Sequence, residues 1–574
     1  MEFQPTKEQS DIINADLSPH CVIACPGSGK TATAVRRLLK IRTRLQDARG
    51  YIALFSYSNI AVETFRGRYR ELSAGLPPFA DRVLIETADA FLASYILRPH
   101  GGRVMEASRA PFLVTGNEPF LRGAKISDGT YPHDISELRI KFLPSLGQFE
   151  FAVQPPGRAA IVVDSGVAQA AIRKVGKMGA YTYELARYWS LLTLVEEPRI
   201  LKALATRFPH LLVDEAQDIG PLHGLLISLL SEAGSIVSLV GDPNQGIYDF
   251  AGADGSFLRD YAKTAGVTCF PLSENRRSVA TIVDASNSFA VTKSTPYRTA
   301  CDRTHGVFYL QYDEDNVDAL VTTFKAILEA NKYTAAEAAV LCRSASTVDR
   351  LKGGGHAVGQ GATERFALSA LARDRHGDIA ASFENATAGL VKLLASPENT
   401  LYRDILDTSA TGDVKVLRRV LWGFVRSAAN GLPDTQMPGK GKWHPQLKKR
   451  LALLLDEMEA RTCYKRSPTW TSNLTVAKLG DEPLWKTDLA QGDEAAIRVD
   501  TVHQAKGEGI AAVLFVARTA DLTKLLAGMH TEEGRIGYVA VTRAEDLLVI
   551  GVPNTAPKKT GKELEGRGIR AWPA

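Results

Sequence analysis

The sequence predicts an α/β protein in which helices flank parallel sheets. Short apolar runs rich in β-branched residues recur along the chain, and each ends in a polar loop that is often followed by a helical period. Continuous apolar runs of this kind are typical of strands buried on both faces. The runs are His20–Ala24, Tyr51–Phe55, Leu211–Val213, Ile236–Val240, Val340–Cys342, Ile497–Val499, Ala512–Val516 and Leu547–Ile550. They fall into two groups, within residues 20–280 and 300–555, which predicts two α/β domains.

Length and composition indicate a multidomain protein of ordinary globular type. The 574 residues exceed what a single core supports and suggest about three or four domains. The 69 basic and 64 acidic side chains leave a net charge of +5, which neither requires nor excludes a nucleic-acid partner. Six scattered cysteines without a CxxC pair argue against a disulfide framework, a zinc site and an iron–sulfur cluster. The charged N-terminus and the lack of a long apolar run favour a cytoplasmic protein without a membrane span.

Two long stretches interrupt the alternation of strands and helices. Residues 95–195 contain loops rich in proline and glycine, whereas residues 351–488 begin with a glycine-rich loop and then have mainly helical periodicity. We therefore expect two α/β domains with one insertion each. The first would comprise residues 1–94 and 196–275 around the insertion 95–195, and the second 276–350 and 489–556 around the insertion 351–488. Residues 557–574, with five lysines and arginines, are expected to form a basic tail.

The strongest local signal is the segment Ala24-Cys25-Pro26-Gly27-Ser28-Gly29-Lys30-Thr31. An apolar run precedes it and a helical period follows it, which is the context of a phosphate-binding P-loop. The glycines let the backbone wrap phosphates, the helix N-terminus supplies partial positive charge, and Lys30 reaches the β- and γ-phosphates of ATP. The Thr31 hydroxyl would ligate Mg²⁺. Ala24 replaces the first glycine of the general pattern, and a purely structural turn is the disfavoured alternative.

A second signal is a pair of acidic residues at the end of an apolar run. Asp214 and Glu215 follow Leu211–Val213 directly, so both carboxylates are expected at the edge of the sheet where the P-loop also lies. There Asp214 would hold Mg²⁺, directly or through water, and Glu215 would orient and deprotonate the attacking water. Such a pair alone is more often a solvated strand end. Because the P-loop is also present, we favour the interpretation that the pair binds Mg²⁺ and activates water.

These segments carry a resemblance to a known family. The P-loop, the DEAQD segment Asp214–Asp218 and the segment Val240–Phe250 (VGDPNQGIYDF) resemble those of superfamily 1A DNA helicases of the UvrD/Rep/PcrA type. Further matches follow in the family's order: Gln9, Phe55–Asn59, Thr87–Phe91, Asn275–Ser278, Asp500–Gly507 and Tyr538–Ala544. The resemblance implies two RecA-like P-loop NTPase domains that hydrolyse ATP with Mg²⁺ in the cleft between them and move along single-stranded DNA.

The resemblance also implies roles for individual residues of the nucleotide site. Gln9 would read the adenine, and Gln245 would sense the γ-phosphate and its attacking water. Arg277 and Arg543 would be arginine fingers, because fixed guanidinium groups stabilise the charge that accumulates on the γ-phosphoryl oxygens in the transition state. Since both fingers would come from the second domain, hydrolysis would require closure of the cleft and would so be coupled to domain motion.

Two positions of the nucleotide site depart from the family pattern. Arg276 stands where the family usually has a tyrosine that stacks on adenine, so stacking must come from the guanidinium plane or be absent. Glu508 lies one position earlier than the family's ribose-binding glutamate, and it is the candidate for that contact here. The selectivity for adenine is therefore open at this stage.

A track for single-stranded DNA is the other element that the resemblance implies. Tyr57, Tyr248 and Phe250 match positions where the family stacks bases on aromatic rings, a contact that tolerates any sequence. Ser56, Asn59, Thr87 and His503 are candidates for phosphate or sugar contacts. Ala251 replaces a usual arginine and Asp89 a usual histidine, so two family contacts are missing. For each of the three aromatic residues, packing in the core is the alternative.

The biological role has two open interpretations. The first is a stand-alone 3′-to-5′ helicase that acts on single-stranded DNA or on a junction of single- and double-stranded DNA. The second is the DNA-sensing motor subunit of an anti-phage complex of the Gabija type, with a nuclease of the OLD family as its partner. A pseudo-ATPase is disfavoured because every catalytic position is filled. The second insertion carries a basic cluster around one tryptophan that could grip duplex DNA or a partner protein, or be a solvated helix face: Lys440, Lys442, Trp443, His444, Lys448, Lys449 and Arg450.

Overall fold

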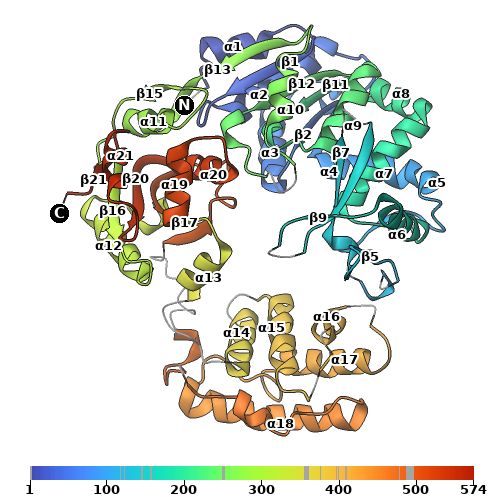
Figure 1. Cartoon of the computed structure of the whole chain (residues 1–574), viewed down its shortest axis with the longest axis vertical. Coiled ribbons are helices and arrows are strands. Elements are labelled where there is room, and N and C mark those ends of the chain that lie inside the picture. Colours follow the sequence, from blue (N-terminus) through green and yellow to red (C-terminus); the bar gives the residue numbers. More distant parts are fainter. Residues whose placement is uncertain are drawn as a thin grey trace. The chain divides into compact units, whose positions relative to one another are not determined.

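Six parallel strands form the first sheet of the protein, in the order β13-β1-β12-β11-β2-β3 (Figure 1). These strands are β1 (His20–Ala24), β2 (Ile52–Ser56), β3 (Val83–Thr87), β11 (His210–Val213), β12 (Ile236–Gly241) and β13 (Thr268–Leu272). The structure is a computed structural model. It describes residues 3–573 except 117, 122, 144–146, 156–157, 249–251, 354–360, 375–376, 396, 399, 408–409, 478 and 487–496.

Helices cover both faces of this sheet, which explains the continuous apolar runs. Along β2, Ile52 and Leu54 pack with apolar side chains of α2 (Lys30–Leu45) and α3 (Asn59–Ser73). Ala53 and Phe55 point to the other face, whose core includes side chains of α9 (Pro221–Glu232). A strand that is covered on both faces has no solvent-exposed face, so its sequence lacks the alternation of apolar and polar residues. The α/β fold class predicted from these runs is confirmed.

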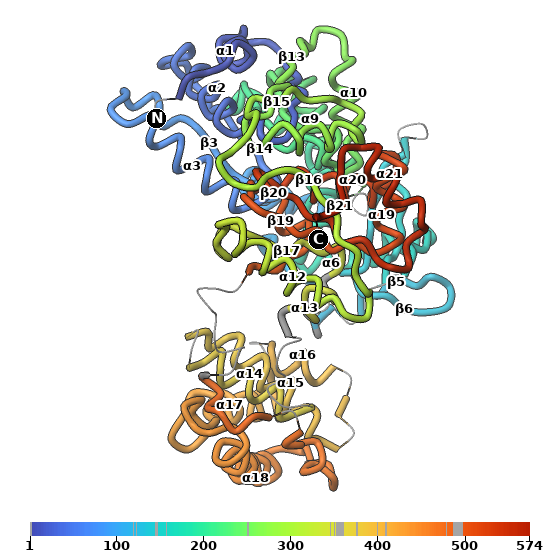
Figure 2. The backbone as a smooth tube through the Cα atoms, turned by 90° about the vertical axis from the view of Figure 1, so that its left-hand side faces the viewer, coloured from blue at the N-terminus to red at the C-terminus, as the bar shows by residue number. Residues whose placement is uncertain are grey.

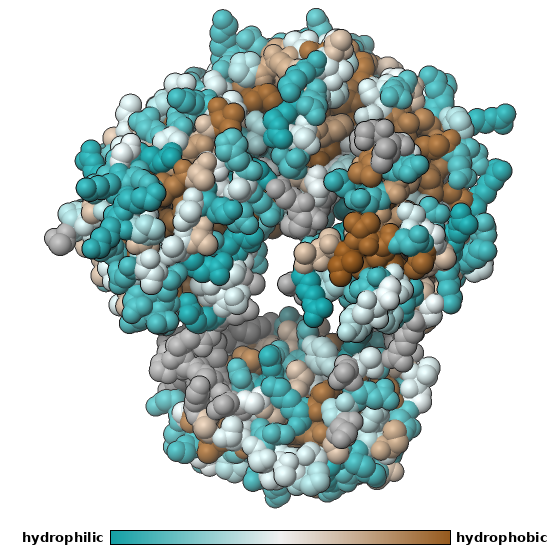
Figure 3. Space-filling model, viewed as in Figure 1, coloured by the Kyte–Doolittle hydropathy of each residue, from teal (hydrophilic) through white to brown (hydrophobic). Residues whose placement is uncertain are grey.

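The segment between β3 and β11 forms a mixed insertion on the same core. Its helices are α4 (Ala88–Phe91), a π-helix (Leu92–Gly101), α5 (Gly102–Val104), α6 (Ser165–Lys177), α7 (Tyr183–Glu196) and α8 (Pro198–Arg207). Its strands are β4 (Phe112–Leu113), β5 (Ile126–Ser127), β6 (Pro132–His133), β7 (Leu138–Leu143), β8 (Gln148–Val153), β9 (Ile161–Val162) and β10 (Ala180–Tyr181). Strands β7, β8 and β9 make a small antiparallel sheet. Ile161, Val162 and Val167 are exposed, and an apolar area lies near β9 and α6 in Figure 3.

A second group of parallel strands has the order β19-β20-β16-β21. It comprises β16 (Gly306–Tyr312), β19 (Ile510–Val516), β20 (Ala544–Pro553) and β21 (Arg570–Ala571), with α11 (Ala280–Asn287), α19 (Thr519–Ala527) and α20 (Glu532–Val541) packed against it. Residues 557–574 were expected to form a basic tail, and that expectation is wrong: they contain α21 (Lys559–Glu565) and β21. Leu564 and Ile569 are buried, and β21 pairs with β16. The two strands lie side by side in Figures 1 and 2.

The chain divides into two compact units, Met1–Asp315 with Val502–Ala574, and Asn316–Thr501. The four-part division with two insertions stays a prediction. In the second unit, β17 (Ala338–Cys342) pairs in parallel with β18 (Arg498–Thr501). In the sequence, α12 (Val317–Ala330) precedes β17 and α13 (Ala345–Gly353) follows it. In the described part of the chain, no helix combines the length and the apolar character needed to cross a membrane.

The rest of the second unit is helical, as the sequence predicts for residues 351–488. Its helices are α14 (Ala362–Asp374), α15 (Ile379–Val391), α16 (Leu401–Leu406), α17 (Gly412–Arg426) and α18 (His444–Arg461), which enclose a common apolar core. Trp443 belongs to that core, with 0% of its surface exposed, and its Nε1 donates to the carbonyl oxygen of Pro433 at 3.2 Å. His444 is also buried. The basic residues around Trp443 therefore do not surround an exposed aromatic ring.

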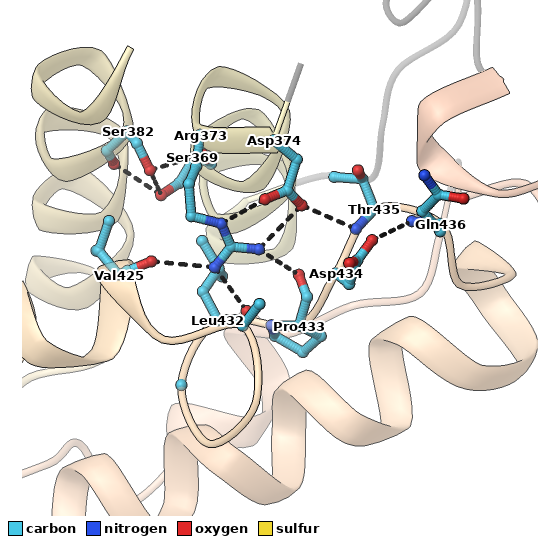
Figure 4. A network of polar contacts seen from close by, with 12 residues as sticks. Ser369, Arg373, Asp374, Ser382, Val425, Leu432, Pro433, Asp434, Thr435 and Gln436 are labelled. Atoms are coloured by element: carbon cyan, nitrogen blue, oxygen red, sulfur yellow. Dashed lines mark hydrogen bonds and ion pairs between the residues drawn. The ribbon is translucent and has the colours of Figure 1, made fainter. Parts of the chain in front are cut away.

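A buried arginine ties this helical core to a loop. The Nε and Nη2 atoms of Arg373 donate to the two carboxylate oxygens of Asp374, at 2.5 and 2.9 Å (Figure 4). Its Nη1 atom donates to the carbonyl oxygens of Val425 and Leu432, at 3.0 and 2.7 Å. Asp374 in turn accepts a hydrogen bond from the backbone N–H of Thr435. The Arg373 side chain, 6% exposed, thus satisfies a carbonyl group in the last turn of α17 and carbonyl groups of the loop that follows it.

Replacing Arg373 by methionine should loosen this loop, because Asp374 and the carbonyl oxygens would stay buried without a partner. We expect a loss of about 3–5 kcal/mol in the stability of the helical region, the range for breaking a buried ion pair. Hydrogen exchange of the α14 and α17 amides measures it. Arg365 is an exposed arginine on the same helix, and Arg365→Met is the control. Equal protection in both variants would show that the network contributes no stability.

Candidate active site

Loops that follow the carboxyl ends of strands in the first sheet carry many of the predicted residues. Residues 25–29 follow β1, Tyr57 follows β2, Asp214 follows β11, Asp242 follows β12 and Ser273 follows β13. Because the strands are parallel, these loops gather at one edge, where α/β proteins bind ligands. A cavity of about 1120 Å³ opens among them.

Most of the predicted site residues line this single cavity. From the nucleotide set these are Pro26, Gly27, Ser28, Gly29, Lys30, Thr31, Asp214, Glu215, Gln245, Arg276, Arg277, Glu508 and Arg543, and from the DNA set Ser56, Tyr57, Tyr248 and His503. Four predicted residues do not line it: Gln9, Ala24, Asn59 and Thr87. Phe250, together with Ala251, lies outside the described residues.

The P-loop has the backbone that its glycines allow. Gly27 and Gly29 have φ angles of +69° and +79°, and Lys30 is the first residue of α2. A side chain at Gly27 would also collide with the segment after β13, because an added Cβ would lie 2.4 Å from Cβ of Arg277 and 2.7 Å from Oδ1 of Asn275. The N–H of Arg276 donates to the carbonyl oxygen of Gly27 at 3.1 Å. Gly27 therefore permits the close approach that brings Arg277 beside the loop.

The acidic pair occupies the position that the sequence predicts, and its two members differ electrostatically. Burial, followed by the charge of Glu215, raises the pKa of Asp214 to about 8. Its Oδ1 atom is buried and has no hydrogen-bond partner among the described residues. Burial also disfavours the charged form of Glu215, but Lys30 and Lys506 outweigh that effect and lower its pKa. Glu215 has a left-handed backbone with φ of +52°, an unusual conformation for a residue with a side chain.

Both candidate arginine fingers contact the same backbone oxygen. Nη1 of Arg277 and Nη1 of Arg543 donate to the carbonyl oxygen of Glu508, at 2.8 and 3.0 Å. The Arg543 guanidinium, 1% exposed, also donates to Oε1 of Gln245 at 3.2 Å. Burial and the neighbouring Arg277 lower the pKa of Arg543 to about 9, still above neutrality. The two guanidinium groups and the predicted γ-phosphate sensor therefore lie in one cluster.

The segment Gln245–Tyr248 is held by residues from the last part of the chain. The carbonyl oxygen of Gln245 accepts a hydrogen bond from Lys506 at 2.9 Å, that of Gly246 from Arg535, and that of Ile247 lies 3.3 Å from Nε2 of His503. The ring of Tyr248 lies 4.8 Å from Nζ of Lys506 and 5.8 Å from the imidazole of His503. Four consecutive residues are thus fixed by residues 503–543, and Gln245 is bound through both its side chain and its backbone.

Gln9 is bonded to the P-loop and does not line the cavity. It is 2% exposed, its Nε2 donates to the carbonyl oxygen of Ser28 at 3.0 Å, and its Oε1 accepts from the N–H of Thr6 at 3.0 Å. The second of these bonds belongs to a capping box at the start of α1 (Lys7–Asn14). One amide N–H and the amide oxygen therefore bond within the protein and support the P-loop, and the adenine-reading role of Gln9 stays a prediction.

The DNA-track candidates divide between the cavity and local structural roles. Tyr57 packs against the apolar core of the sheet, and its buried hydroxyl, like that of Ser56, has no partner among the described residues. The hydroxyl of Thr87 accepts from the N–H of Ala90 at 3.2 Å, so it caps α4. Asn59 is exposed at the first turn of α3. Part of the Tyr57 side chain thus packs in the core, and the hydroxyl of Thr87 has a capping role.

Two groups of charged residues line the cavity without having been predicted. Lys506 donates to both carboxylate oxygens of Asp218 at 2.7 Å, and both side chains are buried. Asp89 pairs with Arg187 of the insertion at 2.9 Å and with His223 of α9 at 3.1 Å. Lys506 and Asp218 belong to the motif segments, so the sequence could have indicated a functional role for them. Arg187 and His223 are far from any motif, so nothing in the sequence indicates them.

Comparison with known proteins identifies a family whose model matches several of the segments that line the cavity. Residues 5–128 and 175–265 match the family described as UvrD/REP helicase N-terminal domain. The chain resembles the UvrD/REP helicases. This confirms the resemblance predicted from the motifs, and the matched residues include the P-loop, the acidic pair and Gln245. The match leaves out residues 129–174, which contain β6 to β9 and most of α6.

Similarity to individual relatives is moderate and covers half of this chain. It is 26% identical over 314 residues to DNA helicase II of Haemophilus influenzae, across 50% of this chain and 40% of the relative. It is 26% identical over 295 residues to ATP-dependent DNA helicase PcrA of Leuconostoc citreum, across 49% and 38%. For ATP-dependent DNA helicase UvrD2 of Mycobacterium tuberculosis (strain ATCC 25618 / H37Rv), the values are 23% over 298 residues, across 49% and 42%. The chain thus spans about two fifths of the length of these relatives.

Substituting Gly27 by alanine should disable the nucleotide site. We expect a positive-φ strain of about 1–2 kcal/mol, together with displacement of Arg277, and a loss of nucleotide affinity of roughly tenfold or more. Thermal unfolding and the affinity for a fluorescent adenosine nucleotide would be measured. Gly75→Ala is the matched control, because Gly75 has φ of +79° and open space around the added Cβ. Equal affinities in the two variants would mean that the contact between Gly27 and Arg277 is dispensable.

Proposed function

We propose that this chain is an ATP-driven motor that moves along single-stranded DNA, as a translocase or helicase. The observation that carries the proposal is the segment Gln245–Tyr248. Gln245 contacts Arg543 on the phosphate side, and Tyr248, three residues later, presents an aromatic ring in the same cavity. Nucleotide chemistry and base stacking would therefore be linked through one short and tightly held piece of backbone.

The charged residues of the cavity support phosphoryl transfer to water. Lys30 and the N–H groups of the P-loop would bind the phosphates, and Glu215 would accept the proton of the attacking water. The lowered pKa of Glu215 keeps its carboxylate ionised near neutral pH, which a general base needs. Arg277 and Arg543 would stabilise the charge on the γ-phosphoryl oxygens. Gln245, which lines the cavity together with Glu215 and is held against Arg543 through its Oε1, would orient the water.

The residues assigned to Mg²⁺ fit such an ion. Thr31 offers a hydroxyl oxygen and Asp214 a carboxylate, the hard donors that Mg²⁺ prefers. The buried Oδ1 of Asp214 has no hydrogen-bond partner among the described residues, and a cation would provide one. When bound, the ion would neutralise charge on the phosphates. Asp214, held neutral by burial when no cation is near, would then be ionised.

The DNA side of the proposal rests on the rest of the cavity lining. Ser56, Tyr57, Tyr248 and His503 line the same cavity as the P-loop, and stacking on rings of this kind is tolerant of sequence. The 3′-to-5′ direction follows from the resemblance alone. The alternative role, in an anti-phage complex with an OLD-family nuclease, would use the same motor. Within the described residues no contact favours it over a free helicase, and copurification from the native host would separate the two.

Two substitutions should abolish ATP hydrolysis in different ways. Lys30→Ala should weaken nucleotide binding, because the phosphates lose their principal cation, whereas Glu215→Gln should keep binding and lose turnover. Binding would be measured with a fluorescent nucleotide and hydrolysis by phosphate release. Near-normal turnover in Glu215→Gln would remove the assignment of this residue as the base.

Single-stranded DNA should strongly raise the ATPase rate, and Arg543→Ala should lose that turnover while it still binds ATP. The reason is that Arg543 is expected to act on the transition state and not on the ground state. Steady-state hydrolysis with and without an oligonucleotide tests it. Arg70→Ala, which removes an exposed arginine on α3, is the control. A rate that is independent of DNA, or an active Arg543→Ala protein, would contradict the coupling.

A further inference from the structure

Two cysteines lie side by side at the edge of the first sheet, and neither lines the cavity. Cys21 is on β1 and Cys269 on β13, and the two residues are register partners in this parallel pair. Register partners project from the same face of a sheet, and adjacent strands are about 4.8 Å apart. A disulfide bond spans Cα separations of about 4.4–6.8 Å. The two side chains are therefore within reach of one covalent bond.

The hydrogen bonds of the two thiols show that they face the same segment of the chain. Sγ of Cys21 donates to the carbonyl oxygen of Leu258 at 3.9 Å, and Sγ of Cys269 donates to that of Ala262 at 3.1 Å. Leu258 is in α10 (Ser256–Tyr261), and Ala262 directly follows the last residue of that helix. The two acceptors are about one helical turn apart. The sulfur atoms therefore point in the same direction, toward α10.

The two thiols differ in their access to solvent. Cys269 is exposed, whereas Cys21 has 0% of its surface exposed. Burial, followed by the charge of Cys269 and a hydrogen bond with its side chain, raises the pKa of Cys21 to about 12. Cys21 therefore stays protonated and out of reach of a dissolved oxidant, since the thiolate is the reactive form. Cys269 is the member of the pair that a small oxidant can reach.

The strand that carries Cys269 has a neighbour on one side only. In the first sheet β13 is the edge strand and pairs with β1 (Figure 1). On the face opposite the cysteines, the rings of His20 and Phe270 stack with their centres 5.2 Å apart. Each cysteine is the second residue of its strand, at the end away from the P-loop. A bond between them would fasten the edge strand without entering the cavity.

We propose that Cys269 and Cys21 form a reversible oxidation site, at which hydrogen peroxide converts the two thiols to a disulfide bond. The sulfur of ionised Cys269 attacks one peroxide oxygen, the O–O bond breaks, and Cys269 becomes a sulfenic acid while hydroxide leaves. The sulfur of Cys21 then attacks that of Cys269, the S–O bond breaks, and the departing hydroxide takes the Cys21 proton as water. Both sulfur atoms are oxidised, and the peroxide is reduced to water. The site is independent of the proposed function.

Cys21 has a protective role in this reaction. A sulfenic acid without a neighbouring thiol is oxidised further to a sulfinic acid, which is irreversible in most proteins, whereas a thiol beside it gives a disulfide that other thiols reduce. A disulfide at an exposed sheet edge is open to such reduction. The buried thiol therefore keeps the oxidation of Cys269 reversible, and the bond holds β13 on β1 while it lasts.

Brief treatment of the whole chain with hydrogen peroxide tests the site. A non-reducing digest should yield the peptides of Cys21 and Cys269 as one linked species, lighter by two hydrogen atoms than the two reduced peptides together. Dithiothreitol should separate them. In Cys269→Ser no linked species should form, whereas Cys463→Ser, which removes the other exposed cysteine, should give as much as the wild type. In Cys21→Ala, Cys269 should accumulate as a sulfinic acid.

Hydrogen exchange measures the effect of the bond on the sheet. The β13 amides should exchange roughly tenfold or more slowly in the oxidised wild type than in the reduced protein, and equally in both forms of Cys269→Ser. A sulfinic acid at Cys269 beside an unmodified Cys21, or a link from Cys269 to any other cysteine, would overturn the pair. Unchanged exchange in protein that carries the linked peptides would overturn the role of the bond in holding β13.

Discussion

The buried ion pair between Lys506 and Asp218 fixes the geometry on which the rest of the cavity depends. Lys506 donates to both oxygens of Asp218, to the carbonyl oxygen of Gln245, and lies over the ring of Tyr248. Its side chain is 8% exposed and that of Asp218 6%, so desolvation cancels much of the attraction. Loss of either partner would leave a buried charge unpaired at a cost of about 3–5 kcal/mol. The main effect of the ion pair is therefore to fix the position of Lys506. Lys506 in turn positions Gln245 and Tyr248, which it contacts directly.

The charges around this pair depend on one another. Burial raises the pKa of Asp218 to about 6 in spite of Lys506, and that of Asp214 to about 8. The same burial lowers the pKa of Arg543 to about 9. Burial thus favours the neutral form of all three groups, and an opposite charge that enters the cavity would favour the charged forms. A polyphosphate with its cation supplies charge of both signs, and so suits a cavity that contains both buried carboxylates and buried guanidinium groups.

The sequence predicted the parts of this protein that are determined by local pattern. The eight apolar runs overlap strands, and in seven of these strands burial on both faces leaves a signal in consecutive residues, whereas β18 is partly exposed. The P-loop and the acidic pair were predictable because their chemistry needs particular residues in adjacent positions. Gln9 shows the limit, since the sequence does not indicate that its amide also bonds to Thr6 and to Ser28 of the P-loop. The predictions for Trp443 and β21 were wrong for a similar reason, because their charged neighbours suggested an exposed position. Packing against distant segments buries Trp443, and β21 pairs with a distant strand.

Asp89 was noted in the sequence only as a missing contact, and its surroundings give it another role. Burial opposes its ionisation, but hydrogen bonds from His223 and Arg187 outweigh it and hold its pKa well below the ordinary value. Arg187 also lies 3.4 Å from Glu184, which accepts the N–H of Ile140 on β7. A continuous chain of polar contacts thus runs from α9 of the first sheet into the insertion. A carboxylate at position 89 repels a phosphate backbone and binds this arginine instead. Asp89 therefore makes a contact that anchors the insertion where the resemblance implies a contact to nucleic acid, and under the proposed function the remaining cavity residues would contact the DNA.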